Sequence, residues 1–436
     1  MKKVSWLLII LVVLLTGCAR RAEPTPEPTP EPTPEVTPQP VPGVTLEPVP
    51  AEPPSDGVQT LSFDDAAAKV RADSDAVYLF ATNVGKGDAL ILRAGDAACL
   101  IDTGKAWARG RVLRGLELLD ANRLGAVFLT HTDDDHAGGL TWLAGEAFAI
   151  VDNWAASAMF TGVKAKKHPM VQVAGDGIKW LGRGDEVPVG DSGAVLNVLA
   201  PASLYEDKDD NNSLVMMLES PHGKVLLAGD MELPEEAELL AQGDDLSCAV
   251  LKVPNHGDDD TTSADFASAC AAQLAVISTS SEEKPGTPDA AVVARLEAAG
   301  SKVVVTEDSG LGVLITLKNG VAEAAYVDFG ASPVSGVSIA EVDASDDIII
   351  LQNTGETAVN LSGCYLYSDR GGELYVFPDG ATVEPGATLT VGTNSTDGDY
   401  DLLWNDKKVV NRKKADAIWL FDPWGRLVDS MGNGID

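Results

Sequence analysis

The chain has 436 residues, of which 45% are hydrophobic, so it is long enough for two or three folded domains. Its 66 acidic residues outnumber its 32 basic residues and give a formal net charge of -34. This balance argues against tight nonspecific binding to nucleic acid or to an anionic membrane. It leaves open a nucleic-acid substrate that is held by metal ions.

The N-terminal residues are typical of a secretory signal. Two lysines precede a short apolar run that ends in LTGC at residues 15–18. This ending resembles the lipobox of bacterial lipoproteins, in which the cysteine, here Cys18, carries the lipid. We therefore expect a signal peptide over residues 1–18 and a lipid anchor on the outer face of the bacterial cytoplasmic membrane. A plain membrane anchor with an incidental cysteine is the alternative.

A proline-rich segment follows at residues 19–58 and begins with repeats of EPTP. Such a composition cannot bury a hydrophobic core and favours an extended polyproline conformation. We interpret it as a disordered stalk between the anchor and the folded domains. A ligand for a partner that binds proline-rich segments is the alternative.

Between residues 59 and 330, short apolar strands alternate with helices. The sequence at 76–104 predicts three strands with tight turns, and residues 112–120 have the apolar spacing of a helix. Further strands follow from residue 194, and a helix is predicted at 288–300. Strands followed by helices, twice over, predict an α/β sandwich of two sheets with helices outside.

Residues 336–436 contain only short strands. Turn signals recur about every ten residues without a helical period, which is typical of a small β-sandwich.

One loop in the first domain concentrates metal-ligand residue types. The sequence THTDDDHAGG, residues 130–139, follows an apolar strand and contains two of the five histidines. His131, Asp133, Asp135 and His136 bring imidazole and carboxylate groups into one short arc, which favours a metal site over a polar turn.

Three distant segments also place a polar residue where an apolar strand ends: IDTG with Asp102, LLAGD with Asp230 and VPNHG with His256. Taken alone, each aspartate is ordinary turn chemistry, and a single histidine is usually satisfied within the fold. Their occurrence together with the His131–His136 cluster favours a shared site.

The order of the motifs GKGDALIL, IDTG, THTDDDHAGG, NNSLVMML, LLAGD and LKVPNHG resembles the metallo-β-lactamase fold. It is most similar to the branch found as the outer domain of the ComEC DNA-uptake competence proteins. The resemblance covers about residues 75–327. It implies an αββα sandwich and a hydrolase with one or two divalent ions, either zinc or manganese.

The resemblance implies two groups of metal ligands. His131 and Asp133 would face one ion, and Asp135 and His136 would face the other, which His256 would complete. A metal-activated water would attack the substrate, so Asp135 and His136 are also the expected catalytic residues.

Other positions are assigned by the same resemblance. Asp230 would bridge the two ions, and Asp102 would support the loop beneath the site. Asn212 and Asn255 stand where relatives often have histidines, so they are weaker candidates for binding metal or substrate.

Departures from the ComEC-like pattern include Asn83, Lys86 and Thr287. They could weaken the first metal or remove a proton donor, which leaves a single-ion or feeble site as an alternative. The His-x-Asp pair at His131 argues against a β-lactamase proper.

Residues 336–436 resemble the lamin-tail domain, an immunoglobulin-like sandwich, which implies an attachment role. A basic stretch in this domain is a candidate contact for nucleic acid or an anionic cell-wall polymer, although a solvated loop face is the alternative. Its residues are Lys407, Lys408, Arg412, Lys413 and Lys414.

The remaining cysteines and histidines receive no role. Buried free thiols are the simplest interpretation of the cysteines beyond Cys18, with a disulfide between Cys248 and Cys270 as an alternative. His168 is expected in an exposed basic loop, and His222 in a hairpin turn.

The sequence therefore predicts a surface-anchored metallo-hydrolase, with extracellular DNA or nucleotides as the expected phosphodiester substrates. A teichoic-acid phosphodiesterase or choline esterase is one alternative. A noncatalytic surface-binding protein with an eroded metal site is another. No protein partner can be identified from the sequence.

Overall fold

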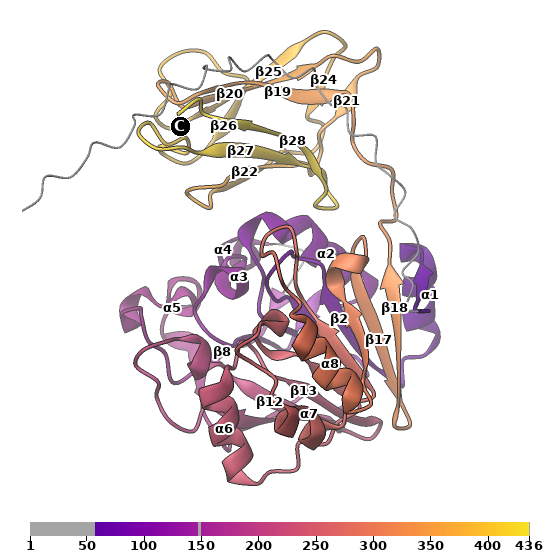
Figure 1. Ribbon diagram of the computed structural model, residues 1–436. Helices are drawn as coiled ribbons and strands as arrows, with labels where there is room; N and C mark the ends of the chain where they lie inside the picture. The colour runs from indigo at the N-terminus through magenta and orange to yellow at the C-terminus, as the bar shows by residue number, and fades with distance from the viewer. Residues whose placement is uncertain (1–56, 147–149, 436) are drawn as a thin grey trace, which may run out of the picture. The chain divides into compact units, whose positions relative to one another are not determined.

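The computed structural model describes residues 57–146 and 150–435, and the predicted sandwich of two sheets with outer helices is confirmed within these ranges (Figure 1). The first sheet has nine strands in the order β1-β18-β17-β2-β3-β4-β6-β8-β9. These strands are β1 (Gln59–Leu61), β2 (Val77–Thr82), β3 (Leu90–Ala94), β4 (Ala97–Ile101), β6 (Ala126–Leu129), β8 (Trp154–Ser157), β9 (Ile178–Leu181), β17 (Gly312–Lys318) and β18 (Val321–Val327).

The second sheet has seven strands in chain order. They are β10 (Glu186–Pro188), β11 (Val195–Ala200), β12 (Val215–Ser220), β13 (Gly223–Leu227), β14 (Val250–Lys252), β15 (Leu274–Ile277) and β16 (Lys302–Val305). From β13 to β16 the strands are parallel, and their residues are largely apolar because both faces of the sheet are covered.

Three apolar layers hold this domain together. The middle layer lies between the sheets and joins residues such as Leu92 and Phe128 to Leu218 and Val250. A second layer packs helices against the outer face of the first sheet, and a third does so on the second sheet. The helices of the first face are α1 (Phe63–Ala72), α2 (Arg109–Leu118), α4 (Leu140–Gly145) and α5 (Pro169–Ala174); those of the second are α6 (Leu233–Gln242), α7 (Ala264–Cys270) and α8 (Ala290–Ala298).

The remaining short elements of this domain lie mostly in its connections. They are β5 (Arg123–Leu124), β7 (Ile150–Val151), α3 (Asp134–Ala137) and the 3-10 helices at Ala106–Ala108, Ala165–Lys167, Gly175–Gly177, Asp210–Asn212, Pro254–Gly257 and Thr306–Asp308.

The C-terminal domain is the predicted β-sandwich, with an apolar core of its own. One sheet consists of β19 (Val337–Asp343), β20 (Ile348–Asn353), β25 (Thr388–Thr393) and β26 (Leu402–Trp404). The other consists of β22 (Tyr365–Ser368), β23 (Leu374–Val376), β27 (Ala417–Phe421) and β28 (Leu427–Gly432), and β21 (Val359–Asn360) pairs with β24 (Thr382–Val383).

Hydrogen bonds connect the C-terminal domain to the start of α2. The hydroxyl of Tyr365 donates to the carbonyl of Trp107 at 2.7 Å and accepts from the amide of Gly110 at 3.2 Å. Arg111 donates to the carbonyl of Gly425 at 3.0 Å and to that of Asn83 at 2.8 Å. Arg111 therefore links the C-terminal domain to the loop that follows β2.

Some predictions fall outside the described residues. The signal peptide with Cys18 and the stalk up to residue 56 are among them. Val58, which the predicted stalk includes, is buried between the sheets, so the folded domain begins before residue 59. Within the described ranges, no helix combines the length and apolar character needed to cross a membrane.

The four cysteines of the described ranges, Cys99, Cys248, Cys270 and Cys364, are free thiols in this structure. The alternative of a disulfide between Cys248 and Cys270 is therefore not realised here.

The prediction that His168 lies in an exposed loop is wrong. Its side chain is buried, its ring centroid lies 4.7 Å from that of Phe160 and 5.1 Å from that of Trp180, and its Nδ1 accepts the amide of Met170 at the start of α5. The basic residues before it suggested exposure, but the aromatic partners come from segments that only the fold brings together.

Replacing His168 with asparagine removes the titrating ring and keeps an acceptor for Met170. Burial lowers the pKa of His168 to about 4, so its contribution to stability is complete above the unfolded-state pKa of about 6.5 and is lost as the pH falls toward 4. Between pH 7 and pH 4, the free energy of unfolding should fall by about 1–3 kcal/mol more in the wild type than in His168→Asn. Urea denaturation at both pH values tests this, and equal declines would contradict it.

Candidate metal centre

The candidate site forms where strands of both sheets end. Asp102 follows β4, His131 follows β6, Asp230 follows β13, and His256 lies in the 3-10 helix after β14. β4 and β6 are parallel, as are β13 and β14, so each pair delivers its following residues to one edge. The sandwich thereby gathers residues that are more than 150 positions apart in the sequence.

Two glycines allow the His131–His136 loop to pack closely. A Cβ atom on Gly138 would lie 2.9 Å from the amide nitrogen of Ala106, and one on Gly139 would lie 2.6 Å from the carbonyl oxygen of Thr103. Any other residue would push the loop away from the segment that carries Asp102.

Asp230 lies at the centre of the histidine cluster. Its Oδ2 is 2.9 Å from Nε2 of His256, 3.1 Å from Nε2 of His136 and 3.9 Å from Nε2 of His131. All three imidazole side chains are fully buried. These four residues, which the sequence predicted to bind metal, are therefore brought together.

The Nδ1 atom of each imidazole contacts a polar group outside the cluster. Nδ1 of His136 lies 2.8 Å from Oδ2 of Asp102, and Nδ1 of His256 lies 2.7 Å from the carbonyl oxygen of Ser278. Nδ1 of His131 lies 3.1 Å from the hydroxyl of Thr130, whose proton is donated to Asp102. These contacts orient each ring so that its Nε2 points toward the Asp230 carboxylate.

The residues present fit a divalent cation. Nε2 of His131 and Oδ1 of Asp230 are buried and have no hydrogen-bond partner among the described residues. A buried polar atom without a partner costs about 1–3 kcal/mol, and imidazole nitrogen and carboxylate oxygen are common ligands of zinc and manganese. Such an ion would satisfy both atoms.

The close contacts between histidines and carboxylates shift the pKa values of His136 and Asp230. Burial by itself would lower the pKa of His136, but the carboxylates of Asp230 and Asp102 outweigh it and raise the pKa well above its usual value. For Asp230, burial would raise the pKa, and His136 and His256 instead hold it well below the ordinary range. The histidine–carboxylate contacts therefore dominate the desolvation of the site.

Asp102 organises the loop as well as lying beneath it. Its buried carboxylate accepts the amide and the hydroxyl of Thr130, both at 2.8 Å, in addition to its contact with His136. One side chain thus fixes the start of the metal loop and the ring orientation of His136.

Asp133 and Asp135 lie at the periphery of the cluster. Oδ2 of Asp135 is 3.6 Å from Nε2 of His256, and ligand atoms of Asp135, His136 and His256 lie within 4.8 Å of one another. The same holds for His131, Asp133 and Asp210. Asp210, whose Oδ1 is 3.6 Å from Nε2 of His131, was missed by sequence reasoning.

The structure turns Asn212 away from the ligands. Its side-chain amide bonds the backbone of Tyr205 on both sides, with its Oδ1 accepting from the amide and its Nδ2 donating to the carbonyl, each at 2.9 Å. The prediction of Asn212 as a metal or substrate residue is therefore corrected: Asp210, two residues earlier, faces His131. The DNN sequence at residues 210–212 indicated a polar residue near the site, but the backbone conformation decides which of the three side chains faces it.

Asn255 also points elsewhere, because its side-chain amide donates to Asp260 at 3.0 Å. Its φ of 42° lies in the left-handed region, next to His256 with φ 54°. Asparagine tolerates this conformation, so Asn255 shapes the turn that presents His256.

Two lysines near the site were not predicted to act there. Nζ of Lys252 lies 2.6 Å from Oδ2 of Asp88, and both side chains are buried. Nζ of Lys86 lies 2.8 Å from Oδ2 of Asp135. The GKGD motif therefore provides one charged residue to each pair.

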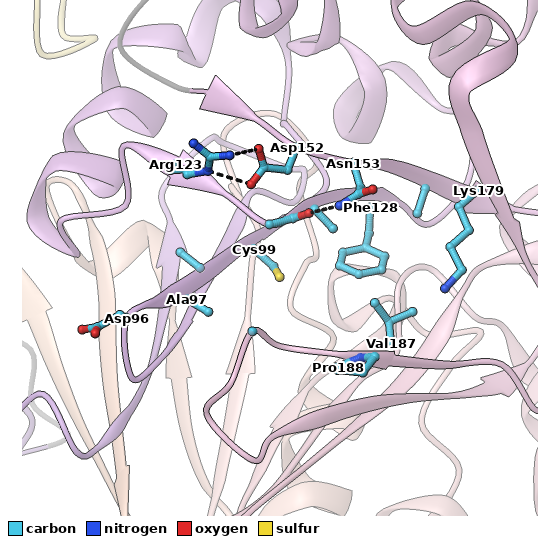
Figure 2. Close-up of a pocket in the computed structure, with 15 residues that line it drawn as sticks. Asp96, Ala97, Cys99, Arg123, Phe128, Asp152, Asn153, Lys179, Val187 and Pro188 are labelled. Atoms are coloured by element: carbon cyan, nitrogen blue, oxygen red, sulfur yellow. Dashed lines mark hydrogen bonds and ion pairs between the residues drawn. The ribbon is translucent and has the colours of Figure 1, made fainter.

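A different cavity, of about 470 Å³, lies at the opposite ends of β4, β6 and β8 (Figure 2). Phe128 and Cys99 line it together with Lys179, and Arg123 makes a two-bond ion pair with Asp152 at its edge. None of the candidate ligands lines this cavity.

Replacing Asp102 with asparagine should weaken divalent-ion affinity by about 10–100-fold, because His136 loses its charged acceptor. Competition with a chromophoric chelator measures this affinity. Asp96→Asn alters an exposed carboxylate in the turn between β3 and β4 and should leave the affinity unchanged. Equal affinities in Asp102→Asn and the wild type would contradict the role of Asp102.

Comparison with protein families agrees with these two folds. Residues 82–192 match the model of the Metallo-beta-lactamase superfamily, and residues 330–434 match that of the Lamin Tail Domain.

Curated relatives match about half of this chain. "Recombination protein 2" of Haemophilus influenzae is 29% identical over 236 residues, covering 52% of this chain and 27% of the relative. "ComE operon protein 3" of Bacillus subtilis is 24% identical over 253 residues, covering 52% of this chain and 31% of the relative. "Competence protein ComA" of Neisseria gonorrhoeae is 25% identical over 230 residues, covering 52% of this chain and 30% of the relative. The chain thus spans less than a third of these relatives' length.

Among solved structures, the metallo-beta-lactamase fold protein YhfI from Bacillus subtilis is 11% identical, covers 54% of this chain and 98% of its own, and has a TM-score of 0.37. A novel metallo hydrolase from Ignicoccus hospitalis is 17% identical, with coverages of 56% and 99% and a TM-score of 0.36. Similarity of this degree carries no information on substrate. The family matches and the described sheets together show a chain that combines a metallo-β-lactamase fold with a lamin-tail domain.

Proposed function

We propose that this chain is a metal-dependent hydrolase that cleaves phosphodiesters. The observation that carries the proposal is the convergence of three imidazole Nε2 atoms on the Asp230 carboxylate, with Nε2 of His131 and Oδ1 of Asp230 left without partners among the described residues. The match to the Metallo-beta-lactamase superfamily supports hydrolysis as the reaction class.

A divalent ion bound here would supply a Lewis acid and would lower the pKa of a water, so that no side-chain nucleophile is needed. The residues of the chain prepare the site for it. Asp102 and the carbonyl of Ser278 hold the protons of His136 and His256 on Nδ1, which keeps each Nε2 free to act as a ligand. Asp133 and Asp210 add carboxylates beside His131.

Lysine side chains gather around the same centre. Lys86 pairs with Asp135 and Lys208 pairs with Asp210, both beside the histidine cluster. Burial and then the charges of these two lysines lower the pKa of Lys284. Although nearby carboxylates pair with them, these cations could exchange partners for the oxygens of a phosphodiester. Relatives named for competence and recombination support DNA or nucleotides as the substrate.

One observation favours a second candidate substrate. A cavity of about 530 Å³ beside Asp133 and Asp210 is also lined by Asp134, Glu206 and Asp207, whose carboxylates outnumber the single ammonium group of Lys208 there. A polyanion would be repelled there, whereas a phosphodiester or ester that carries an ammonium group, such as a choline-bearing teichoic acid, would be attracted. We therefore retain a cell-wall phosphodiesterase or choline esterase as the alternative.

We also propose that the chain acts on the outer face of the cytoplasmic membrane, attached through Cys18 by a lipid. The LTGC sequence supports this anchor, and the relatives named as competence proteins are consistent with a membrane-associated role. The lamin-tail domain would then provide contacts with a polymer outside the cell.

Activity assays test the hydrolase directly. The protein loaded with Mn²⁺ or Zn²⁺ should turn over bis-p-nitrophenyl phosphate and either DNA, RNA or a choline-bearing teichoic acid. Asp230→Asn should lower kcat/KM by at least about 100-fold, because it removes the carboxylate at the centre of the cluster. Asp379→Asn, in an exposed turn of the C-terminal domain, serves as the matched control. Absence of turnover on every phosphodiester would overturn the proposal.

The basic stretch of the C-terminal domain makes a separate prediction. It connects β26 of one sheet to β27 of the other. Buried Val409 and Val410 anchor it, and its basic side chains are all exposed: Lys407, Lys408, Arg412, Lys413 and Lys414.

Changing these five residues to glutamate should weaken binding to DNA or to purified cell walls by at least about tenfold at low salt, because exposed cations release counterions on contact with a polyanion. Sedimentation with each polymer measures the binding. The control changes Lys164, Lys166 and Lys167 to glutamate, because these residues form an exposed basic stretch of the first domain. Unchanged binding to both polymers would show that this surface is only a solvated loop.

A further inference from the structure

Lys86 brings a positive charge into the candidate metal centre. Its Nζ lies 2.8 Å from Oδ2 of Asp135, and only 22% of its side chain is exposed. The same Asp135 oxygen lies 3.6 Å from Nε2 of His256. The ammonium group therefore contacts an Asp135 oxygen that also faces Nε2 of His256, where an ion held by Asp135, His136 and His256 would lie.

The backbone around Lys86 keeps the ammonium in this position. The amide of Asp88 donates to the carbonyl of Asp135 at 3.1 Å, and a Cβ atom on Gly87 would lie 2.5 Å from that carbonyl oxygen. The amide of Lys86 itself donates to Glu283 at 3.3 Å. The loop after β2 thus lies directly against the metal loop, and Lys86 extends from it toward the carboxylate of Asp135.

Two of the candidate ligand groups share one histidine nitrogen. Ligand atoms of His131, His136 and Asp230 form one group, and those of Asp135, His136 and His256 form another. Nδ1 of His136 is held by Asp102 at 2.8 Å, so only Nε2 is available, and its lone pair binds one ion at a time. The group of His131, Asp133 and Asp210 shares no residue with that of Asp135, so a second ion depends on whether Asp135 is free.

The two ligand groups differ in whether their atoms already have partners. The group around Asp230 contains the two buried atoms without partners, Nε2 of His131 and Oδ1 of Asp230. His256 can join this group, because its Nε2 lies 2.9 Å from Oδ2 of Asp230. In the other group, the carboxylate of Asp135 already has a cationic partner in Lys86.

We propose that Lys86 takes the place of a second metal ion: the centre binds one divalent ion through His131, His136, His256 and Asp230, and the ammonium of Lys86 supplies the second cation at Asp135. This inference rests on the proposed metallo-hydrolase. It gives Lys86 a positioning role for an anionic substrate, as a fixed charge beside the ion.

Metal stoichiometry tests the role of Lys86 independently of activity. After saturation with Mn²⁺ and removal of free ions, elemental analysis should find one ion per chain in the wild type and in Lys86→Arg, which keeps the charge. Lys86→Gln and Lys86→Met should bind two ions: with Asp135 released, it can hold one ion with His136 and His256, while His131 holds another with Asp133 and Asp210. Lys105→Gln is the matched control: Lys105 pairs with Glu283 beside the same loop and should leave one ion per chain.

Electron paramagnetic resonance provides a second readout on the same samples. The wild type should show isolated Mn²⁺, and Lys86→Gln should show the coupling of two neighbouring Mn²⁺ ions. Thermal melting establishes that each variant is folded, and either neutral variant that folds suffices for the test.

Each outcome is decisive. Two ions in the wild type would overturn the role of Lys86 and leave the proposed hydrolase intact. One ion in both folded neutral variants would also overturn it, because the lysine would not be what excludes the second ion. No bound ion in any protein, including Lys105→Gln, would overturn the metallo-hydrolase itself.

Discussion

Three imidazole nitrogens and one carboxylate face one another inside the first domain. The Nδ1 atoms of His131, His136 and His256 each contact a partner elsewhere, so their Nε2 atoms are directed at Asp230. In a buried position such an arrangement is unfavourable without a proton or a metal cation, because partial negative charges converge where water cannot screen them, and the raised pKa of His136 reflects this. The rest of the site follows from this constraint.

The surrounding network explains why the cluster does not rearrange to relieve the repulsion. Asp102 binds both the start of the metal loop and the ring of His136, and the Asp88–Lys252 ion pair lies buried nearby. Breaking either interaction would leave an unpaired charge in the interior, which costs several kcal/mol. The fold therefore maintains ligand geometry at the ends of strands whose apolar runs hold the sheets together.

The C-terminal domain also contributes to this architecture. Arg111 is half-buried and bonds the carbonyls of both Gly425 and Asn83, and Asn83 begins the loop that carries Lys86. These hydrogen bonds hold the C-terminal domain against the loop that contacts the candidate metal centre.

The sequence by itself determined the two folds and named most of the candidate ligands that the structure brings together. Apolar strands that end in His131, Asp230 or His256 are local patterns, and the strand direction requires such ends to meet at one edge of the sandwich. The sequence could not determine which member of DNN faces His131, where Lys86 extends or that His168 is buried. Those outcomes depend on backbone conformation and on contacts between distant segments: Asp210 is 79 residues from His131, and Lys86 is 49 residues from Asp135. Only tertiary packing sets such distances, because a side chain's partner is fixed by the direction of its Cα–Cβ bond within the folded chain.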